Sequence, residues 1–300
     1  MKPKAQFSAR HPFLFGFALL ILAVVLFMGA SAFFGGRHLG GAGSSGRTVG
    51  VVYLEGMILD GADVVAFLRE LREDPDVEGV LLRVNSPGGA VAPSQEMFQA
   101  VRELAAVKPV VASYGSVAAS GGYYASCPAT LIVANPGSVT GSIGVLMEYM
   151  DMSELAGELG VRRVLLASGK NKGAGSPLEP LTPQQREQLM GIVRDMHDQF
   201  VSDVTIARSM RKDVVAALAD GRVYTGRQAR ENGLVDELGG FEYALSRLMD
   251  LCHMTERPDL YEGPPRDVPL LEKLVGAESA ARLFTSWTQR LVPGVRFLYQ

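Results

Sequence analysis

The chain begins with a long apolar run, and the 25 residues 12–36 contain no charged side chain. About 20 apolar helical residues suffice to cross a hydrocarbon core of ~30 Å, so the run predicts a transmembrane helix. A cleaved signal peptide is the alternative, because Ala30-Ser31-Ala32 has the form of a cleavage site. The run is longer than the roughly 7–15 residues of a signal h-region, which favours an uncleaved anchor.

Positive charges set the expected orientation of this anchor. Lys2, Lys4 and Arg10 precede it, so residues 1–11 are expected in the cytoplasm. Residues 37–47 are rich in Gly and Ser and predict a flexible linker. The pattern therefore predicts a single-pass protein of the inner (cytoplasmic) membrane, with its main domain at residues 48–255 on the periplasmic or other extracytoplasmic side.

Beyond the linker, short β-rich runs alternate with amphipathic stretches, and nearly continuous apolar strands separated by helices favour a parallel sheet covered on both faces. This pattern predicts an α/β domain. Strands are expected at 48–56, 77–85, 109–115, 130–136 and 162–169, and helices at 63–72 and 93–104.

The second half of the chain reads as mostly helical. Thr182 and Pro183 are a typical N-cap and first helical residue, and they predict a helix running toward Met210. A short helix is expected between Thr225 and Gly233, and another from Phe241 to about Leu251. The remaining residues, 256–300, predict a C-terminal arm that ends in an amphipathic helix over about 270–291.

Composition excludes several classes of function. The formal net charge of −3 gives no basic surface, so nucleic acid is not an expected partner. The chain has two cysteines, Cys127 and Cys252, and no CxxC, HExxH or histidine cluster. We therefore expect no disulfide, no metal and no cofactor.

Two glycine-rich motifs follow predicted strands. Ser86-Pro87-Gly88-Gly89 could offer bare backbone N–H groups to an oxyanion, or could be an ordinary strand-to-helix turn. Ser120 stands among small residues, and Gly121 could donate its N–H directly after a nucleophile. A serine at a helix start is also a common N-cap.

A serine hydroxyl needs a base nearby, and histidine supplies it poorly in this sequence. Two histidines flank the predicted anchor, a third is expected on a solvated helix face between Asp195 and Asp198, and the fourth has no nucleophile motif around it: His11, His38, His197 and His253. Lys170 and Lys172 lie in a Gly-rich loop. Desolvation in an apolar cleft can lower the pKa of a lysine from roughly 10.4, although a lysine in such a loop is commonly a solvated charge.

Five motifs in this sequence together resemble the signal peptide peptidase A family of serine proteases in its short, membrane-anchored form. They extend over about residues 48–250 and are SPGG, GSVAASGGYYAS, TGSIGV, GKNKGAGSP and TGRQAxxxGLVDELGG. The resemblance implies a ClpP/crotonase-like fold with a repeated β-β-α core, a parallel sheet flanked by helices, and one domain that holds both members of a Ser-Lys dyad. It implies Ser120 as nucleophile, Lys172 as base, and Gly88, Gly89 and Gly121 as oxyanion donors.

The resemblance also implies substrates and partners. The family's substrates are remnant signal peptides and misfolded envelope proteins, and its members form homo-oligomers in which neighbouring subunits build the groove. Asn171 and Gly173 depart from the family's usual loop residues without touching the dyad. Ser142 is a candidate for orienting the lysine, or is simply a turn residue. Aliphatic side chains are expected to line the cleft, with Val91, Leu146 and Met147 as candidates.

Two other functions fit part of the sequence. The TG…GLVD stretch also resembles the crotonase superfamily, which would make the protein an acyl-CoA hydratase or isomerase. The predicted anchor and the pairing of SGG with GKxK oppose that interpretation. A membrane scaffold that keeps the fold without activity is the third possibility, and the presence of both Ser120 and Lys172 opposes it.

Overall fold

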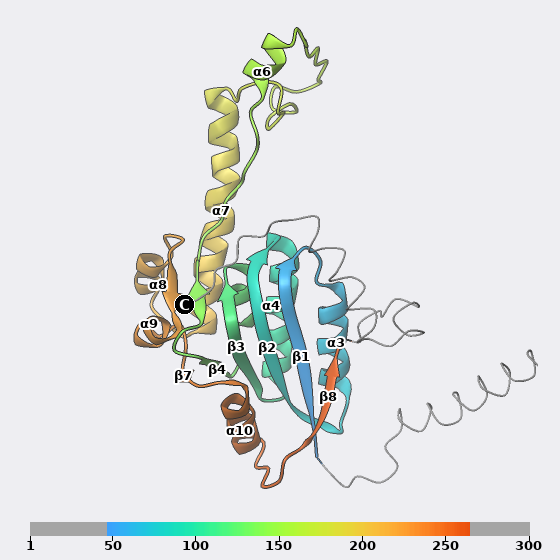
Figure 1. The fold of residues 1–300 in the computed structure, drawn as a ribbon, viewed down its shortest axis with the longest axis vertical. Coiled ribbons are helices and arrows are strands. Elements are labelled where there is room, and N and C mark those ends of the chain that lie inside the picture. The colour runs from blue at the N-terminus through green and yellow to red at the C-terminus, as the bar shows by residue number, and fades with distance from the viewer. Residues whose placement is uncertain (1–46, 265–300) are drawn as a thin grey trace, which may run out of the picture. The chain divides into compact units, whose positions relative to one another are not determined.

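The computed structural model describes residues 47–264, which form a mixed β-sheet with helices on both faces (Figure 1). The predicted anchor at 12–36 and the predicted helix at 270–291 lie outside the described residues. No helix between residues 47 and 264 is both long and apolar enough to span a membrane. The predicted α/β fold is confirmed.

The sheet runs in the order β6-β5-β3-β2-β1-β8, with β4 paired to β3 and β7 paired to β4. Every pairing is parallel except the antiparallel contact between β5 and β6. The carboxyl ends of β1, β2, β3 and β5 therefore meet at one edge, where open α/β sheets bind ligands. The strands are β1 (Thr48–Ile58), β2 (Val77–Gly89), β3 (Val110–Ala119), β4 (Leu131–Ala134), β5 (Val139–Gly141), β6 (Val223–Thr225), β7 (Glu237–Leu238) and β8 (Asp259–Gly263).

The helices divide between the two faces of the sheet. The larger apolar core lies on one face and includes residues of α3, α4, α5, α7 and α8, with Leu68 and Leu71 fully buried. On the other face, Leu245 and Leu248 of α10 pack on Val51 and its neighbours. The helices are α3 (Ala62–Glu73), α4 (Val91–Ala105), α5 (Gly121–Ser126), α6 (Ser153–Glu158), α7 (Pro183–Ala207), α8 (Lys212–Leu218), α9 (Gly226–Glu231) and α10 (Phe241–Leu251).

Two segments differ from the sequence-based expectation. The predicted strand at 162–169 is wrong: this segment forms no regular element, and Val164 and Leu166 are 84% and 93% exposed. Residues 259–263, expected within a loop or arm, form strand β8, which pairs in parallel with β1. The helix predictions at 63–72, 93–104 and 241–251 are confirmed by α3, α4 and α10.

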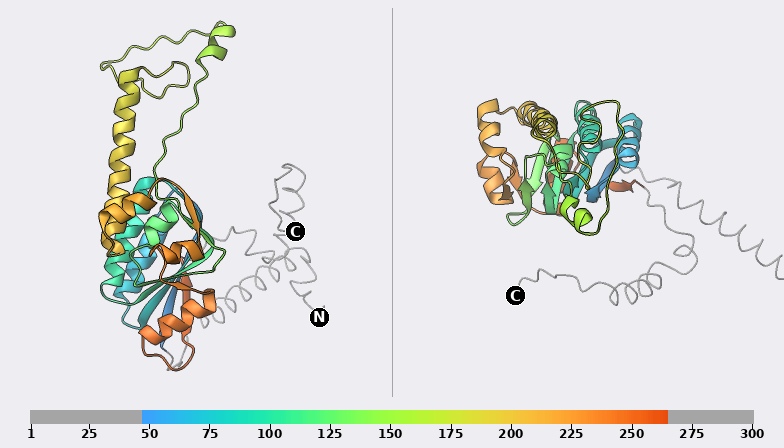
Figure 2. Two further views of the ribbon diagram at one scale, coloured as in Figure 1. Left: turned by 90° about the vertical axis from the view of Figure 1, so that its left-hand side faces the viewer. Right: turned by 90° about the horizontal axis from the view of Figure 1, so that it is seen from above.

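Residues 146–192 form a projection that we call the arm. Figures 1 and 2 show α7 extending from the sheet, with α6 at its far end. Much of the arm's apolar surface is open to solvent within one chain. Its exposed apolar residues are Leu146, Met147, Met150, Met152, Leu155, Leu159, Val161, Val164, Leu165, Leu166, Met190 and Ile192.

Candidate active site

Ser120 occupies the sharp turn between β3 and α5. Its backbone has φ 51° and ψ −121°, and it is the N-cap residue of α5 without making a side-chain cap hydrogen bond. A non-glycine residue in such a conformation is strained, and strain of this kind clusters at functional sites. The N–H of Ser120 donates to the carbonyl oxygen of Gly141 at 2.8 Å, and its own carbonyl accepts the N–H of Tyr124 at 2.8 Å. The surrounding backbone therefore holds the hydroxyl-bearing residue in place.

The glycine pair at the end of β2 lies against this turn. Gly88 has φ 99°, and a Cβ atom added there would lie 2.6 Å from the nitrogen of Gly121 and 2.8 Å from Cβ of Ser120. The N–H of Gly88 donates to the hydroxyl of Ser86 at 3.1 Å. Only glycine permits this approach, and it places the Gly88-Gly89 backbone beside the amide of Gly121, as an oxyanion site requires.

Ser142 follows β5 on the opposite side of Ser120. It also has a positive φ, 50°, and its N–H donates to the carbonyl of Arg222 at 2.9 Å. β5 pairs with β3 so that Gly141 lies opposite Ala119. This register places Ser142 next to the turn that holds Ser120.

These three segments surround a cavity of about 670 Å³. Gly88, Gly89, Ser120, Gly121 and Ser142 all line it, as do Val91 and Leu146. Met147, also expected in the cleft, is not among its lining residues. The other lining residues are Met57, Pro87, Ser94, Gln95, Tyr124, Gly144, Val145, Met196, His197, Phe200, Ala219, Asp220 and Gly221. The wall is mostly apolar, and no lysine or arginine from residues 47–264 lines it.

Two side chains in the wall that can lose a proton, Tyr124 and Asp220, are each held in one protonation state. Burial raises the pKa of Tyr124, and the hydrogen bond that its hydroxyl donates to Asp203 raises it further. Hydrogen bonds from Arg222 lower the pKa of Asp220 to about 2. Tyr124 is therefore neutral and Asp220 is an ionised, paired carboxylate, so neither is available as a base for Ser120 at neutral pH.

Lys172 lies away from the cavity in this chain. It is exposed in the loop joining α6 to α7, and the carbonyl of the nearby Lys170 accepts a hydrogen bond from the side chain of Gln185 at 3.3 Å. At 1.5 Å per residue, Gln185 is about 18 Å along α7 from His197, which lines the cavity. One chain in this arrangement does not bring Lys172 to Ser120.

His197 is the lining residue whose position the sequence interpretation missed. It is half-buried at the cavity wall, whereas it was expected on a solvated face. The buried residues Phe200, Val201 and Val204 mark the inward side of α7, and His197 precedes Val201 by one helical turn. That spacing is the signal that could have placed it on the inward side.

Gly88→Ala is expected to lower the reactivity of Ser120, measured as its rate of labelling by a fluorophosphonate, by about 100-fold or more, since a misplacement near 1 Å costs that much. The new methyl group would press on Ser120 and Gly121. Gly233→Ala is the matched control: its φ is also positive, at 77°, but its Cβ would meet Met210 at an ordinary 3.6 Å. Both variants bear backbone strain, so equal losses of activity would contradict a specific role for Gly88.

A strained serine between a glycine-lined recess and an apolar cavity defines the class of protein, a serine hydrolase with an α/β fold. The sequence model of peptidase family S49 matches residues 102–255. The chain belongs to this family of serine-type peptidases, and the predicted relation to the signal peptide peptidase A family is confirmed.

Two relatives that are named as proteases agree with the assignment of this chain to peptidase family S49. A candidate protease of Methanocaldococcus jannaschii is 39% identical over 198 residues, which cover 66% of this chain and 63% of the relative. A candidate signal peptide peptidase of Enterococcus faecium is 39% identical over 193 residues, which cover 63% of this chain and 55% of the relative. The match spans less than two thirds of the length of either relative.

Among solved structures, this chain is similar to a ClpP1 variant from Listeria monocytogenes. The match covers 66% of this chain and 94% of the ClpP1 chain. The TM-score is 0.44 and the sequence identity is 15%.

Proposed function

We propose that the protein is an endopeptidase that cleaves apolar peptides with Ser120 as its nucleophile and Lys172 as its base. The observation that carries this proposal is the strained backbone of Ser120 at the mouth of the apolar cavity, directly beside Gly88. This geometry presents a hydroxyl group and backbone amides to one substrate carbonyl.

In the proposed reaction, the neutral amine of Lys172 takes the proton of Ser120 as Oγ attacks the scissile carbonyl carbon. The resulting oxyanion accepts hydrogen bonds from the N–H of Gly121 and that of Gly89, or that of Gly88 once it leaves the hydroxyl of Ser86. The C–N bond then breaks, and the leaving amine takes the proton from the lysine ammonium. Water, deprotonated by the same lysine, then attacks the acyl carbon of the ester; the bond between that carbon and Oγ breaks, the lysine ammonium returns the proton to Ser120, and the acid is released. The hydroxyl of Ser142 orients the lysine.

We infer that the arm of a neighbouring copy delivers Lys172. Within one chain the Lys172 loop lies far along α7 from the cavity, and the arm exposes an extensive apolar surface. Large exposed apolar patches on soluble proteins commonly mark sites of interaction with other proteins. Packing of arms between copies in a homo-oligomer would bury this surface and desolvate the lysine.

The lining of the cavity supports an apolar substrate. Val91, Val145, Leu146, Met196 and Phe200 lie in its wall, where they would accept aliphatic side chains. A signal peptide left in the membrane after preprotein cleavage has such side chains, and a misfolded envelope protein exposes them. The proposed anchor at 12–36 would keep the domain next to these substrates, on the extracytoplasmic side of the inner membrane.

An acyl-CoA hydratase or isomerase is the alternative enzyme, and the wall of the cavity opposes it. Such enzymes use glutamates near the oxyanion glycines, yet no glutamate of residues 47–264 lines the cavity, and Asp220 is paired with Arg222.

Assays with two substrate classes test the proposed function. We expect the full-length protein in detergent to cleave a fluorogenic apolar leader peptide, and to leave crotonyl-CoA unchanged. A charge-rich peptide of equal length serves as the matched control and should be cleaved at a much lower kcat/KM. Hydration of crotonyl-CoA without peptide cleavage would refute the proposal.

A further inference from the structure

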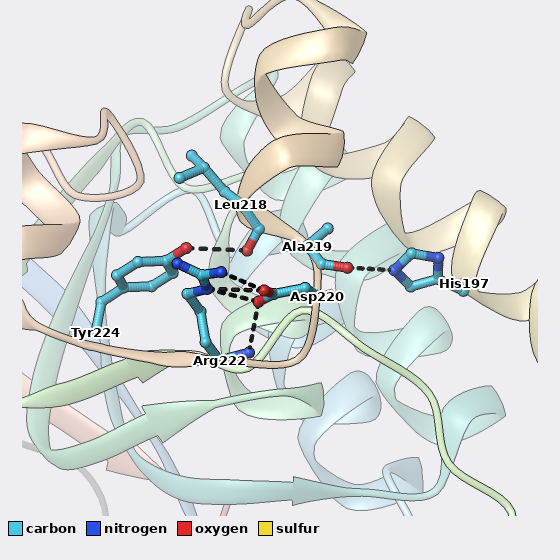
Figure 3. A network of polar contacts seen from close by, with 6 residues as sticks. All are labelled: His197, Leu218, Ala219, Asp220, Arg222 and Tyr224. Carbon is cyan, nitrogen blue, oxygen red and sulfur yellow. Dashed lines mark hydrogen bonds and ion pairs between the residues drawn. The ribbon is translucent and has the colours of Figure 1, made fainter.

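The imidazole of His197 connects α7 to a neighbouring turn that also lines the cavity. Its Nε2 lies 2.7 Å from the carbonyl oxygen of Ala219 (Figure 3). A carbonyl oxygen can only accept, so Nε2 carries the proton and donates it to this bond. The ring is therefore engaged as a donor and does not offer Nε2 as a base to Ser120.

The turn that His197 contacts comprises residues 219–222 and is braced from within. The side chain of Arg222 donates to the carboxylate of Asp220 at 2.8 and 2.9 Å, and the hydroxyl of Tyr224 donates to the carbonyl of Leu218 at 3.2 Å (Figure 3). These contacts fix the conformation of the 219–222 turn, so a shift of α7 at His197 would shift the turn as a unit.

This turn holds the segment that carries Ser142. The N–H of Gly221 donates to the carbonyl of Ile143 at 3.1 Å, and the N–H of Ser142 donates to the carbonyl of Arg222 at 2.9 Å. A Cβ atom on Gly144 would lie 3.1 Å from Cα of Gly221, so the two backbones are in direct contact. Two backbone hydrogen bonds and this close approach therefore fasten the turn to the Ser142 segment.

The Ser142 segment in turn holds the nucleophile. Gly141 precedes Ser142, and its carbonyl accepts the N–H of Ser120 at 2.8 Å. Because Ser120 is in a strained conformation, it relies on such contacts to stay there. A continuous path of hydrogen bonds and peptide links thus runs from His197 through the 219–222 turn to Ser120.

Two other side-chain hydrogen bonds of α7 join it to other helices and not to the 219–222 turn. Gln199 accepts a hydrogen bond from Gln95 of α4 at 2.8 Å, and Asp203 accepts one from Tyr124 of α5. Within the described part of the chain, His197 makes the side-chain hydrogen bond that joins α7 to the 219–222 turn. The same helix begins in the arm that carries the Lys172 loop.

We propose that His197 is a positioning residue that couples the arm helix α7 to Ser120 through the 219–222 turn. The coupling rests on the proposed function of Ser120 and Lys172, since it links Ser120 of one site to the arm whose Lys172 acts at the site of a neighbouring copy. His197 transfers no proton in the reaction. Its contribution is to hold the turn, and hence Ser120, in a fixed position relative to α7.

Three substitutions at His197 test this assignment. The amide nitrogen of glutamine is as many bonds from Cα as Nε2 of histidine, so His197→Gln can still donate to Ala219. Asparagine is one bond shorter, and leucine cannot donate. We expect His197→Asn and His197→Leu to lower kcat about tenfold or more, and His197→Gln to stay within about threefold of wild type. KM should change less than kcat.

Gln199→Leu is the matched control, because it removes another hydrogen bond of α7 without touching the turn, and its kcat should stay within about twofold of wild type. Labelling of Ser120 by a fluorophosphonate gives a second readout and should slow in parallel with kcat.

A glutamine variant as impaired as the leucine variant would overturn the proposal, because the imidazole itself would then be required. So would wild-type rates in all three variants. If the wild-type protein cleaved no peptide, the proposed function would fail independently of this coupling.

Discussion

Ser120→Ala is expected to lower the rate of peptide hydrolysis by about 10⁴-fold or more, the scale seen when a serine nucleophile is removed. The change deletes the attacking oxygen and leaves the glycine recess intact. Alanine keeps the same Cβ, so the strained backbone at φ 51° is unchanged and the protein should fold as before. Steady-state hydrolysis of the leader peptide and circular dichroism measure the two effects.

Ser120→Gly is the informative companion variant. It is equally inactive, but glycine adopts a positive φ without a steric penalty. We expect its free energy of unfolding to exceed that of Ser120→Ala by about 1 kcal/mol, measured by chemical denaturation, since strain of this kind costs of order 1–3 kcal/mol. Substantial peptide hydrolysis by either variant would show that Ser120 is not the nucleophile.

Lys172→Ala is expected to lower kcat by about 10²–10⁴-fold, the usual contribution of a general base. Lys170→Ala is a close control, because both lysines are exposed in the same loop and each substitution removes one positive charge. We expect Lys170→Ala to retain most of the wild-type rate. Full activity in Lys172→Ala would exclude this lysine as the base.

Mixing the two inactive variants tests where the lysine acts. If a neighbouring copy supplies Lys172, co-refolded Ser120→Ala and Lys172→Ala chains should recover about a quarter of the wild-type rate, because a site is intact when two independent subunits both contribute a wild-type residue. No recovery in assemblies shown to contain both chains would place the base and the nucleophile in the same chain.

Local signals were sufficient to locate most helices. The start of α7 is set by Thr182, Pro183 and Gln185, which form a capping box with proline in the first turn. The hydrophobic spacing of α3 and α4 likewise indicated which faces are buried. These features depend on residues within a few positions of one another, so a single sequence contains them.

The strand expected at 162–169 shows where local pattern fails. Its apolar residues resemble those of a core strand, yet Val164 and Leu166 are exposed and unpaired with any strand in residues 47–264. An apolar run in a sequence indicates that its side chains are buried against something, but it does not indicate whether a sheet of the same chain or another molecule buries them. In this protein the run belongs to the arm, whose apolar surface we assign to contacts between copies.

The nucleophile region was predictable because topology brings its parts together. Gly88 lies at the carboxyl end of β2, Ser120 follows β3 and Ser142 follows β5; these strands are parallel, and their carboxyl ends share one edge. The sequence by itself therefore determined the α/β class, the family resemblance and the residues at this edge. Each of these rests on local motifs and on their order along the chain.

Tertiary structure decided which other groups reach that edge. His197 lies 77 positions from Ser120 in the chain, and the packing of α7 against the sheet places it at the cavity. The projection of the same helix carries Lys172 away from it. Helical spacing can place His197 on the inward side of α7, but the segments that this side meets and the direction of the helix are set by contacts between distant residues. The proposed nucleophile thus lies in a motif that the sequence itself contains, whereas the proposed delivery of its base depends on contacts between copies.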